Sequence, residues 1–120
     1  MSQHLEIGKT GEELAKTYLE SKGYLILETN WRFKHLEVDI IAKKDNALSI
    51  VEVKTRSSKY AGEPYLAVDK QKQKLLFSAA NAYIERKNID VAVQFDIISI
   101  VLSGQTHTIE HIEDAFSPQW

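Results

Sequence analysis

Three ionisable residues, Asp39, Glu52 and Lys54, interrupt apolar segments of the chain. Asp39 stands within the run Val38–Ile41, and Val53 separates Glu52 from Lys54. Because successive side chains of a β-strand point to opposite faces, Glu52 and Lys54 share one face of a predicted strand. Asp39 lies on the preceding strand of a predicted hairpin and reaches the same patch. The sequence therefore predicts that the three groups converge.

Two carboxylates and an amine in contact favour one kind of chemistry. Carboxylate oxygens are hard ligands for Mg²⁺, which keeps several waters and is commonly shared with a phosphate. A bound metal lowers the pKa of water and neutralises charge on the phosphate. We therefore expect Asp39 and Glu52 to bind the metal and Lys54 to orient the water or stabilise developing charge. The alternative is an ion pair that serves packing and strand register only.

The elements that must position these groups follow from the spacing of apolar and turn residues. An apolar stripe predicts a first helix over 7–22, which ends at Gly23. Asp69 is the predicted N-cap of a second helix over 70–87. Segments rich in β-branched residues predict strands over 24–33, 37–42, 47–54, 91–102 and 106–112.

The resulting element order is α-β-β-β-α-β-β, which predicts a single α/β domain over residues 1–120 with a mixed sheet. The first three strands form an antiparallel meander, and the second helix supplies the crossover to a parallel neighbour. Residues 55–68 are predicted to form a loop and residues 113–120 a short tail.

Composition narrows the class of protein. A 120-residue chain with 43% hydrophobic and 27% charged residues is typical of a globular domain that buries a core. The absence of cysteine excludes disulfides and thiolate zinc sites. No apolar run approaches the roughly 20 residues that cross a bilayer, and the N-terminal residues lack the pattern of a secretory signal. We therefore expect a cytoplasmic protein without a membrane partner.

The charge is unevenly distributed along the chain. The net charge is -2, but residues 54–87 hold eight basic and three acidic residues, a net of +5. Basic side chains near the predicted site could contact DNA phosphates, which supply much of the sequence-independent affinity. The alternative is a solvated, lysine-rich helix face. The candidate nucleic-acid-binding residues are Arg32, Arg56, Lys59, Lys70 and Lys74.

The spacing of Asp39 and Glu52-Val53-Lys54 resembles the signature of the PD-(D/E)xK nuclease superfamily. A longer set of motifs resembles the YraN-like family of uncharacterised bacterial proteins, which is related in fold to archaeal Holliday junction resolvases. The resemblance covers about residues 5–116. Its motifs are Gly8-x-x-Gly11-Glu12-x-x-Ala15, Leu19-x-x-Lys22-Gly23-Tyr24, Asn30-Trp31-Arg32, Glu37-x-Asp39-x-Ile41-Ala42, Val51-Glu52-Val53-Lys54-x-Arg56 and Phe95-Asp96.

This resemblance implies a restriction-endonuclease-like fold, Mg²⁺ or Mn²⁺ at the acidic site, and DNA as the substrate. It also implies that Glu12 adds to the metal site from the first helix; the alternative is a surface glutamate favoured by the helix dipole. Resolvase-like relatives act as dimers, so a homodimer is expected. This chain departs from the family pattern at Leu36, where a glycine is usual, and at Gln94, where an arginine is usual.

Two functions follow as hypotheses. The first is a metal-dependent endonuclease that hydrolyses DNA phosphodiester bonds, including those of branched recombination or repair intermediates. The second is a non-catalytic module that retains a nuclease fold and binds nucleic acid or a protein. Metal binding and DNA cleavage discriminate between them.

Overall fold

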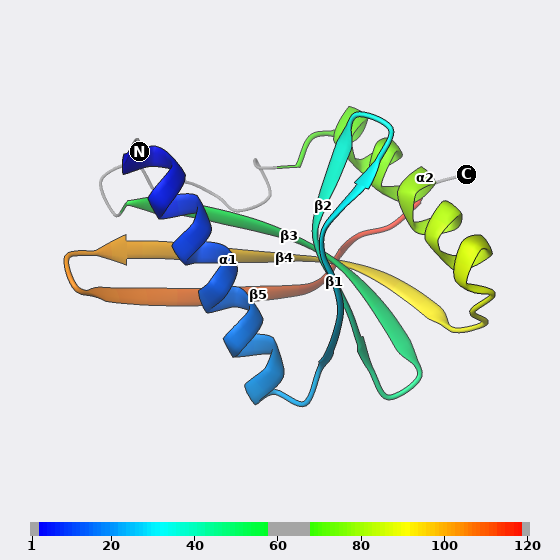
Figure 1. Ribbon diagram of the computed structural model, residues 1–120, viewed down its shortest axis with the longest axis horizontal. Helices are drawn as coiled ribbons and strands as arrows, with labels where there is room; N and C mark the ends of the chain where they lie inside the picture. Colours follow the sequence, from blue (N-terminus) through cyan, green and yellow to red (C-terminus); the bar gives the residue numbers. More distant parts are fainter. Residues whose placement is uncertain (1–2, 58–67, 119–120) are drawn as a thin grey trace.

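The computed structural model describes residues 3–57 and 68–118. Its five-stranded sheet has the order β1-β2-β3-β4-β5, and two helices pack against it. Figure 1 shows that helix α1 crosses the sheet near one end, whereas helix α2 lies near the opposite end of the sheet. The elements are α1 (Gln3–Ser21), β1 (Leu25–Phe33), β2 (Leu36–Lys44), β3 (Ala47–Ser57), α2 (Lys70–Lys87), β4 (Ala92–Ser103) and β5 (Thr106–Phe116).

The strand directions confirm the predicted α-β-β-β-α-β-β order and the mixed sheet. β1, β2 and β3 form an antiparallel meander, whereas β3 and β4 are parallel and are joined through α2. β5 then pairs with β4 in the antiparallel sense. A parallel pair requires a crossover connection, which explains why the long amphipathic segment lies between β3 and β4.

Alternation along the central strands divides the apolar core into two clusters. Ile50 and Ile97 pack with the residues of α2, whereas the adjacent Val51 and Ile98 pack with those of α1. This is the pattern of strands covered on both faces. Each face of the sheet can therefore carry its own polar site without contact with the other.

Local residue chemistry fixes the ends of the helices. The side chain of Asp69 accepts a hydrogen bond of 2.8 Å from Lys72 N, which confirms it as the N-cap of α2. Asn88 ends α2 in the left-handed conformation with φ of 52°. The predicted bounds of α2 are correct. Helix α1 begins at Gln3, earlier than predicted, and ends at Ser21, two residues before Gly23.

Two predicted irregular segments are partly wrong. β3 continues through residues 55–57, which pair with β4 along its length; residues 58–67 of the predicted loop lie outside the described residues. β5 extends to Phe116 and includes residues 113–116 of the predicted tail. A register shift between Phe95 and Ile97 allows this extension, because it brings Phe116 opposite Phe95.

Strands β2 and β3 diverge before either one ends. Their pairing runs from Lys44↔Ala47 to Ile40↔Val51, whereas β3 remains paired with β4 as far as Ser57. In Figure 1 the β1–β2 hairpin turns toward α2 while β3 continues beside β4. Asp39 and Glu52 lie next to the last paired positions, where the sheet opens. Within the described chain, no helix is long and apolar enough to span a membrane.

Candidate functional site

Asp39 and Glu52 form the centre of an acidic site at the divergence of β2 and β3. Val53 N donates a hydrogen bond of 2.7 Å to Asp39 Oδ2. Burial and the neighbouring carboxylate of Glu52 raise the pKa of Asp39 from 3.8 to about 9, although the hydrogen bond from Val53 opposes the shift. Two carboxylates in contact cannot both hold a negative charge at low cost. The site therefore favours either a proton or a cation between them.

Glu52 carries a buried side chain, with 8% of its surface exposed. Its Oε2 lies 2.9 Å from Lys72 Nζ, the distance of an ion pair. Hydrogen-bond geometry is nevertheless not met, and no described residue forms a hydrogen bond to this oxygen. The short distance still makes Lys72 the partner of this oxygen, because charge attraction depends less on alignment than a hydrogen bond does. Glu52 Oε2 is therefore held by charge attraction alone.

Glu12 approaches the pair from helix α1. A Cβ at Gly11 would overlap Thr55 Oγ1, so only glycine allows α1 to lie this close to β3. Glu12 contributes to the raised pKa of Asp39 through its charge. With its amide nitrogen turned towards them, Asn30 donates to both oxygens of Glu12 at 3.2 Å and to Glu37 Oε1 at 2.8 Å. The packing of α1 on β3 therefore brings Glu12 close to Asp39.

An open pocket of about 220 Å³ connects Asp39 and Glu12 to the surface. It lies between the middle of α1 and the β1–β2 hairpin. Its lining residues are Glu12, Glu13, Lys16, Thr29, Asn30, Asp39 and Ile40. The donor set is composed of carboxylate oxygens, the ligands that Mg²⁺ and Mn²⁺ prefer. Asp39 and Glu52 fit a divalent cation because the cation would relieve their like-charge contact. Together with Glu12 they do not bring three ligand oxygens within 4.8 Å of one another, so a third carboxylate ligand from Glu12 requires side-chain movement.

The cation that pairs with Glu52 is Lys72 of α2, whereas the alternative of a purely structural ion pair involved Lys54. Lys54 lies on β3 two residues after Glu52, as strand alternation requires, but its side chain is exposed. Lys72 lies two residues from both Lys70 and Lys74, so it occupies a different face of α2 from these two lysines. Its ion pair with Glu52 shows that this face is turned towards the sheet.

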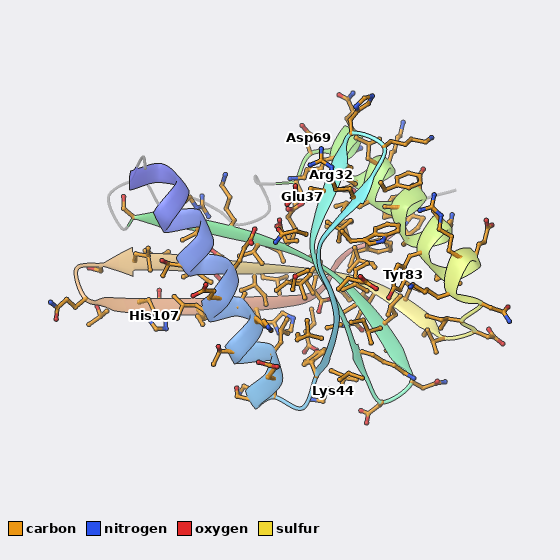
Figure 2. The ribbon with its side chains drawn as sticks, in the orientation of Figure 1. Arg32, Glu37, Lys44, Asp69, Tyr83 and His107 are labelled. Atoms are coloured by element: carbon orange, nitrogen blue, oxygen red, sulfur yellow. The ribbon has the colours of Figure 1, made fainter. Side chains whose placement is uncertain are left out.

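The predicted nucleic-acid-binding residues are distributed over several surfaces. Arg32 and Glu37 form an exposed ion pair of 3.5 Å at the β1–β2 hairpin (Figure 2). Arg56 is partly buried on β3, and Lys59 lies outside the described residues. Lys70 and Lys74 line an open groove of about 810 Å³ between α2 and the end of β5, with Phe77 and Phe116 among its other walls. The described basic residues therefore do not form one continuous patch around Asp39.

A second polar cluster, which was not predicted from the sequence, lies on the α1 face of the sheet. Asp96 is fully buried, and its Oδ2 lies 2.8 Å from Nε2 of His111, which is 7% exposed. Ligand atoms of Asp96, His111 and Glu113 lie within 4.8 Å of one another, so this group could hold a metal ion. Tyr24 donates a hydrogen bond of 3.1 Å to Glu113. His107, in contrast, is exposed at the start of β5 (Figure 2).

The protein itself already supplies most of the contacts of Asp96. Gln94 Nε2 donates to both of its oxygens at 3.1 and 3.3 Å, and Asp114 N donates at 3.0 Å. Gln94, a departure from the family pattern, therefore has a structural role here. Leu36, the other departure, is buried in the core cluster on the α2 side. The signal for this cluster was present in the sequence, because Asp96 interrupts an apolar strand just as Asp39 does.

Comparison with known proteins places these residues in a family. Residues 11–100 match the family described as "Uncharacterised protein family UPF0102". A UPF0102 protein of Flavobacterium psychrophilum is 48% identical over 116 residues, which cover 97% of this chain and 98% of the relative. A UPF0102 protein of Bacteroides thetaiotaomicron is 49% identical over 118 residues, which cover 98% of each chain. These matches confirm the predicted resemblance to a YraN-like family, and the chain belongs to the uncharacterised protein family UPF0102.

Proposed function

We propose that this protein is a metal-dependent endonuclease that hydrolyses DNA phosphodiester bonds at the Asp39–Glu52 site. The observation that carries the proposal is the contact between the buried carboxylate of Glu52 and the partly buried carboxylate of Asp39, where burial and the charge of Glu52 raise the pKa of Asp39 to about 9. Such a contact is costly for stability alone and is typical of sites that bind or transfer cations. Its place at the opening of a mixed sheet agrees with the resemblance to restriction-endonuclease-like folds.

Each residue has a distinct role in the proposed reaction. Asp39 and Glu52 supply oxygen ligands for Mg²⁺ or Mn²⁺, and Glu12 adds a third carboxylate from α1. When bound, the metal would activate water and neutralise charge on the phosphate. Val53 N fixes the Asp39 carboxylate through its 2.7 Å hydrogen bond. Lys54, exposed at the same stretch of β3, stabilises the charge that develops on the phosphate or orients the attacking water.

The proposed substrate is DNA, including branched recombination or repair intermediates. The support is the resemblance to Holliday junction resolvases together with the lysines at the start of α2. Lys70 and Lys74 line the groove beside Phe77, a combination suited to phosphates and bases. A homodimer is part of this proposal, because a branched substrate presents two strands to cut.

A cleavage panel tests the proposal. Purified protein is incubated with four-way, nicked, single-stranded and linear duplex DNA in Mg²⁺, Mn²⁺ or a chelator. We expect metal-dependent cleavage that Glu52→Gln and Asp39→Asn abolish, because both lose a charged ligand while keeping side-chain size. Asp45→Asn is the matched control, since Asp45 is exposed in the β2–β3 turn. Cleavage by Glu52→Gln at the wild-type rate would refute the assignment.

The second candidate function is a non-catalytic module that binds nucleic acid or a protein. The ion pair between Lys72 and Glu52 favours it, because this lysine balances the charge of Glu52 without a metal. Calorimetry discriminates between the two functions. A module without catalysis would take up no Mg²⁺ or Mn²⁺ at Asp39 and Glu52, with or without DNA, whereas the nuclease requires such uptake.

A further inference from the structure

We propose that Lys72 is a built-in counter-cation of the acidic site, which competes with the divalent metal for Glu52 and withdraws when the metal binds. The inference rests on the proposed function, because it concerns the same carboxylates. It assigns a positioning role to a residue outside the PD-(D/E)xK signature. The basis is the 2.9 Å contact between Lys72 Nζ and Oε2 of a buried glutamate.

The start of α2 holds Lys72 in place. The Asp69 side chain caps the helix through Lys72 N itself, at 2.8 Å, so the backbone of this residue is fixed in the first turn. At about 100° per residue, Lys72 shares a helix face with Leu76 and Tyr83, which are buried against the sheet. The Lys72 side chain therefore projects towards β3 because the buried face of α2 carries it.

The ammonium group and a metal compete for the charge of Glu52. A carboxylate oxygen can accept more than one partner, but a metal about 2.0–2.1 Å from Oε2 would lie close to an ammonium only 2.9 Å from the same atom. Repulsion between two cations this close weakens the binding of each. Metal binding at Glu52 Oε2 therefore favours the withdrawal of Lys72.

Lys72 has a path along which to withdraw. Its side chain is 37% exposed, whereas that of Glu52 is 8% exposed, so the lysine can rotate towards solvent without disturbing the core. The displaced ammonium stays attached to α2 beside the site. There it provides a positive charge near an incoming phosphate, in addition to Lys54. Lys72 thus neutralises Glu52 when no metal is bound and faces the substrate phosphate when the metal is bound.

Calorimetric titration with Mn²⁺ tests the competition without reference to catalysis. Lys72→Met removes the charge and keeps the length of the side chain, Lys72→Arg keeps the charge, and Lys43→Met is the control because Lys43 is exposed near the far end of β2. We expect Lys72→Met to bind Mn²⁺ roughly tenfold more tightly than wild type, because a cation in contact with the ligand is removed. Lys72→Arg and Lys43→Met should remain within about twofold of wild type.

Thermal unfolding supplies a second readout. Without metal, Lys72→Met should melt below wild type, because Glu52 loses its partner cation, and saturating Mn²⁺ should raise its melting temperature more than that of wild type. Equal or weaker Mn²⁺ binding by Lys72→Met would overturn the proposal, as would the absence of binding in both proteins. Tighter binding by Lys72→Met without cleavage of any DNA would support the role of Lys72 and refute the nuclease. Metal-dependent DNA cleavage by the wild type, with equal Mn²⁺ affinity of wild type and Lys72→Met, would support the nuclease and refute the role of Lys72.

Discussion

Val53 N donates a 2.7 Å hydrogen bond to Asp39 Oδ2 just beyond Ile40↔Val51, the last paired position of β2 and β3. A carboxylate takes the place of a backbone carbonyl at the point where the ladder stops. The separation of the strands would otherwise leave this partly buried N–H without a partner. The Asp39 carboxylate therefore completes the backbone hydrogen bonding of β3 and also lies beside the Glu52 side chain.

Gly11→Ala tests whether the close approach of α1 to β3 builds the site. The new Cβ would overlap the Thr55 side chain, so either this side chain or α1 must shift. We expect the free energy of unfolding in urea to fall by about 1–3 kcal/mol. Adding Thr55→Ala should restore part of this loss, because it removes the nearest atom. An unfolding midpoint of Gly11→Ala equal to wild type would contradict the packing of this helix.

The pH dependence of stability tests the contact between Asp39 and Glu52. The pKa of Asp39 rises from 3.8 to about 9 on folding, so the folded chain holds this proton more tightly than the unfolded chain. Its contribution to stability is fully present below the unfolded pKa and is lost as the pH rises through about 9. Asp39→Asn cannot lose this proton and still accepts from Val53.

We therefore expect metal-free Asp39→Asn to melt above wild type near pH 9, with a smaller difference near pH 6. Asp45→Asn controls for the loss of one acidic charge elsewhere. Parallel curves of melting temperature against pH for wild type and Asp39→Asn would show that Asp39 is not perturbed in the folded protein.

Lys54→Met tests the catalytic role assigned to Lys54. Because this side chain is exposed, we expect the free energy of unfolding to change by less than about 0.5 kcal/mol. The single-turnover rate of DNA cleavage should fall by about 100-fold or more, as for other groups that stabilise developing charge. Lys43→Met should cleave at the wild-type rate. If Lys54→Met does so as well, Lys54 has no part in the reaction.

The salt dependence of DNA binding tests the groove beside α2. We expect Lys70→Gln with Lys74→Gln to weaken binding of all DNA sequences, because both side chains are predicted to bind phosphates. On duplex DNA, the slope of log affinity against log salt should become shallower by about 0.9 for each phosphate that the variant no longer neutralises. Lys22→Gln, exposed just after α1, is the control. An unchanged slope would place the DNA elsewhere on the protein.

Short-range signals in the sequence predicted much of the fold. Asp69 marked the start of α2 because N-capping depends on residues three positions apart. Alternation in Ile50–Lys54 placed Glu52 and Lys54 on one face because side-chain direction in a strand is a local property. The crossover through α2 followed from its position between two apolar strands.

Interactions between distant segments could not be predicted in the same way. Lys72 reaches Glu52 through the packing of α2 on the sheet, which no spacing along the chain encodes. The cluster of Asp96 and His111 depends on the pairing of β4 with β5 and on the register shift after Phe95. The extension of β5 was missed for the same reason, since strand pairing decided it rather than residue preference.

The location of bound metal tests the central claim most directly. Crystals soaked in Mn²⁺ and measured for anomalous scattering would show the ion itself. We expect one peak about 2 Å from carboxylate oxygens of Asp39 and Glu52, with Lys72 Nζ withdrawn from Glu52. A peak at Asp96, His111 and Glu113 alone, or no peak at either group, would contradict the claim that Asp39 and Glu52 form the metal site.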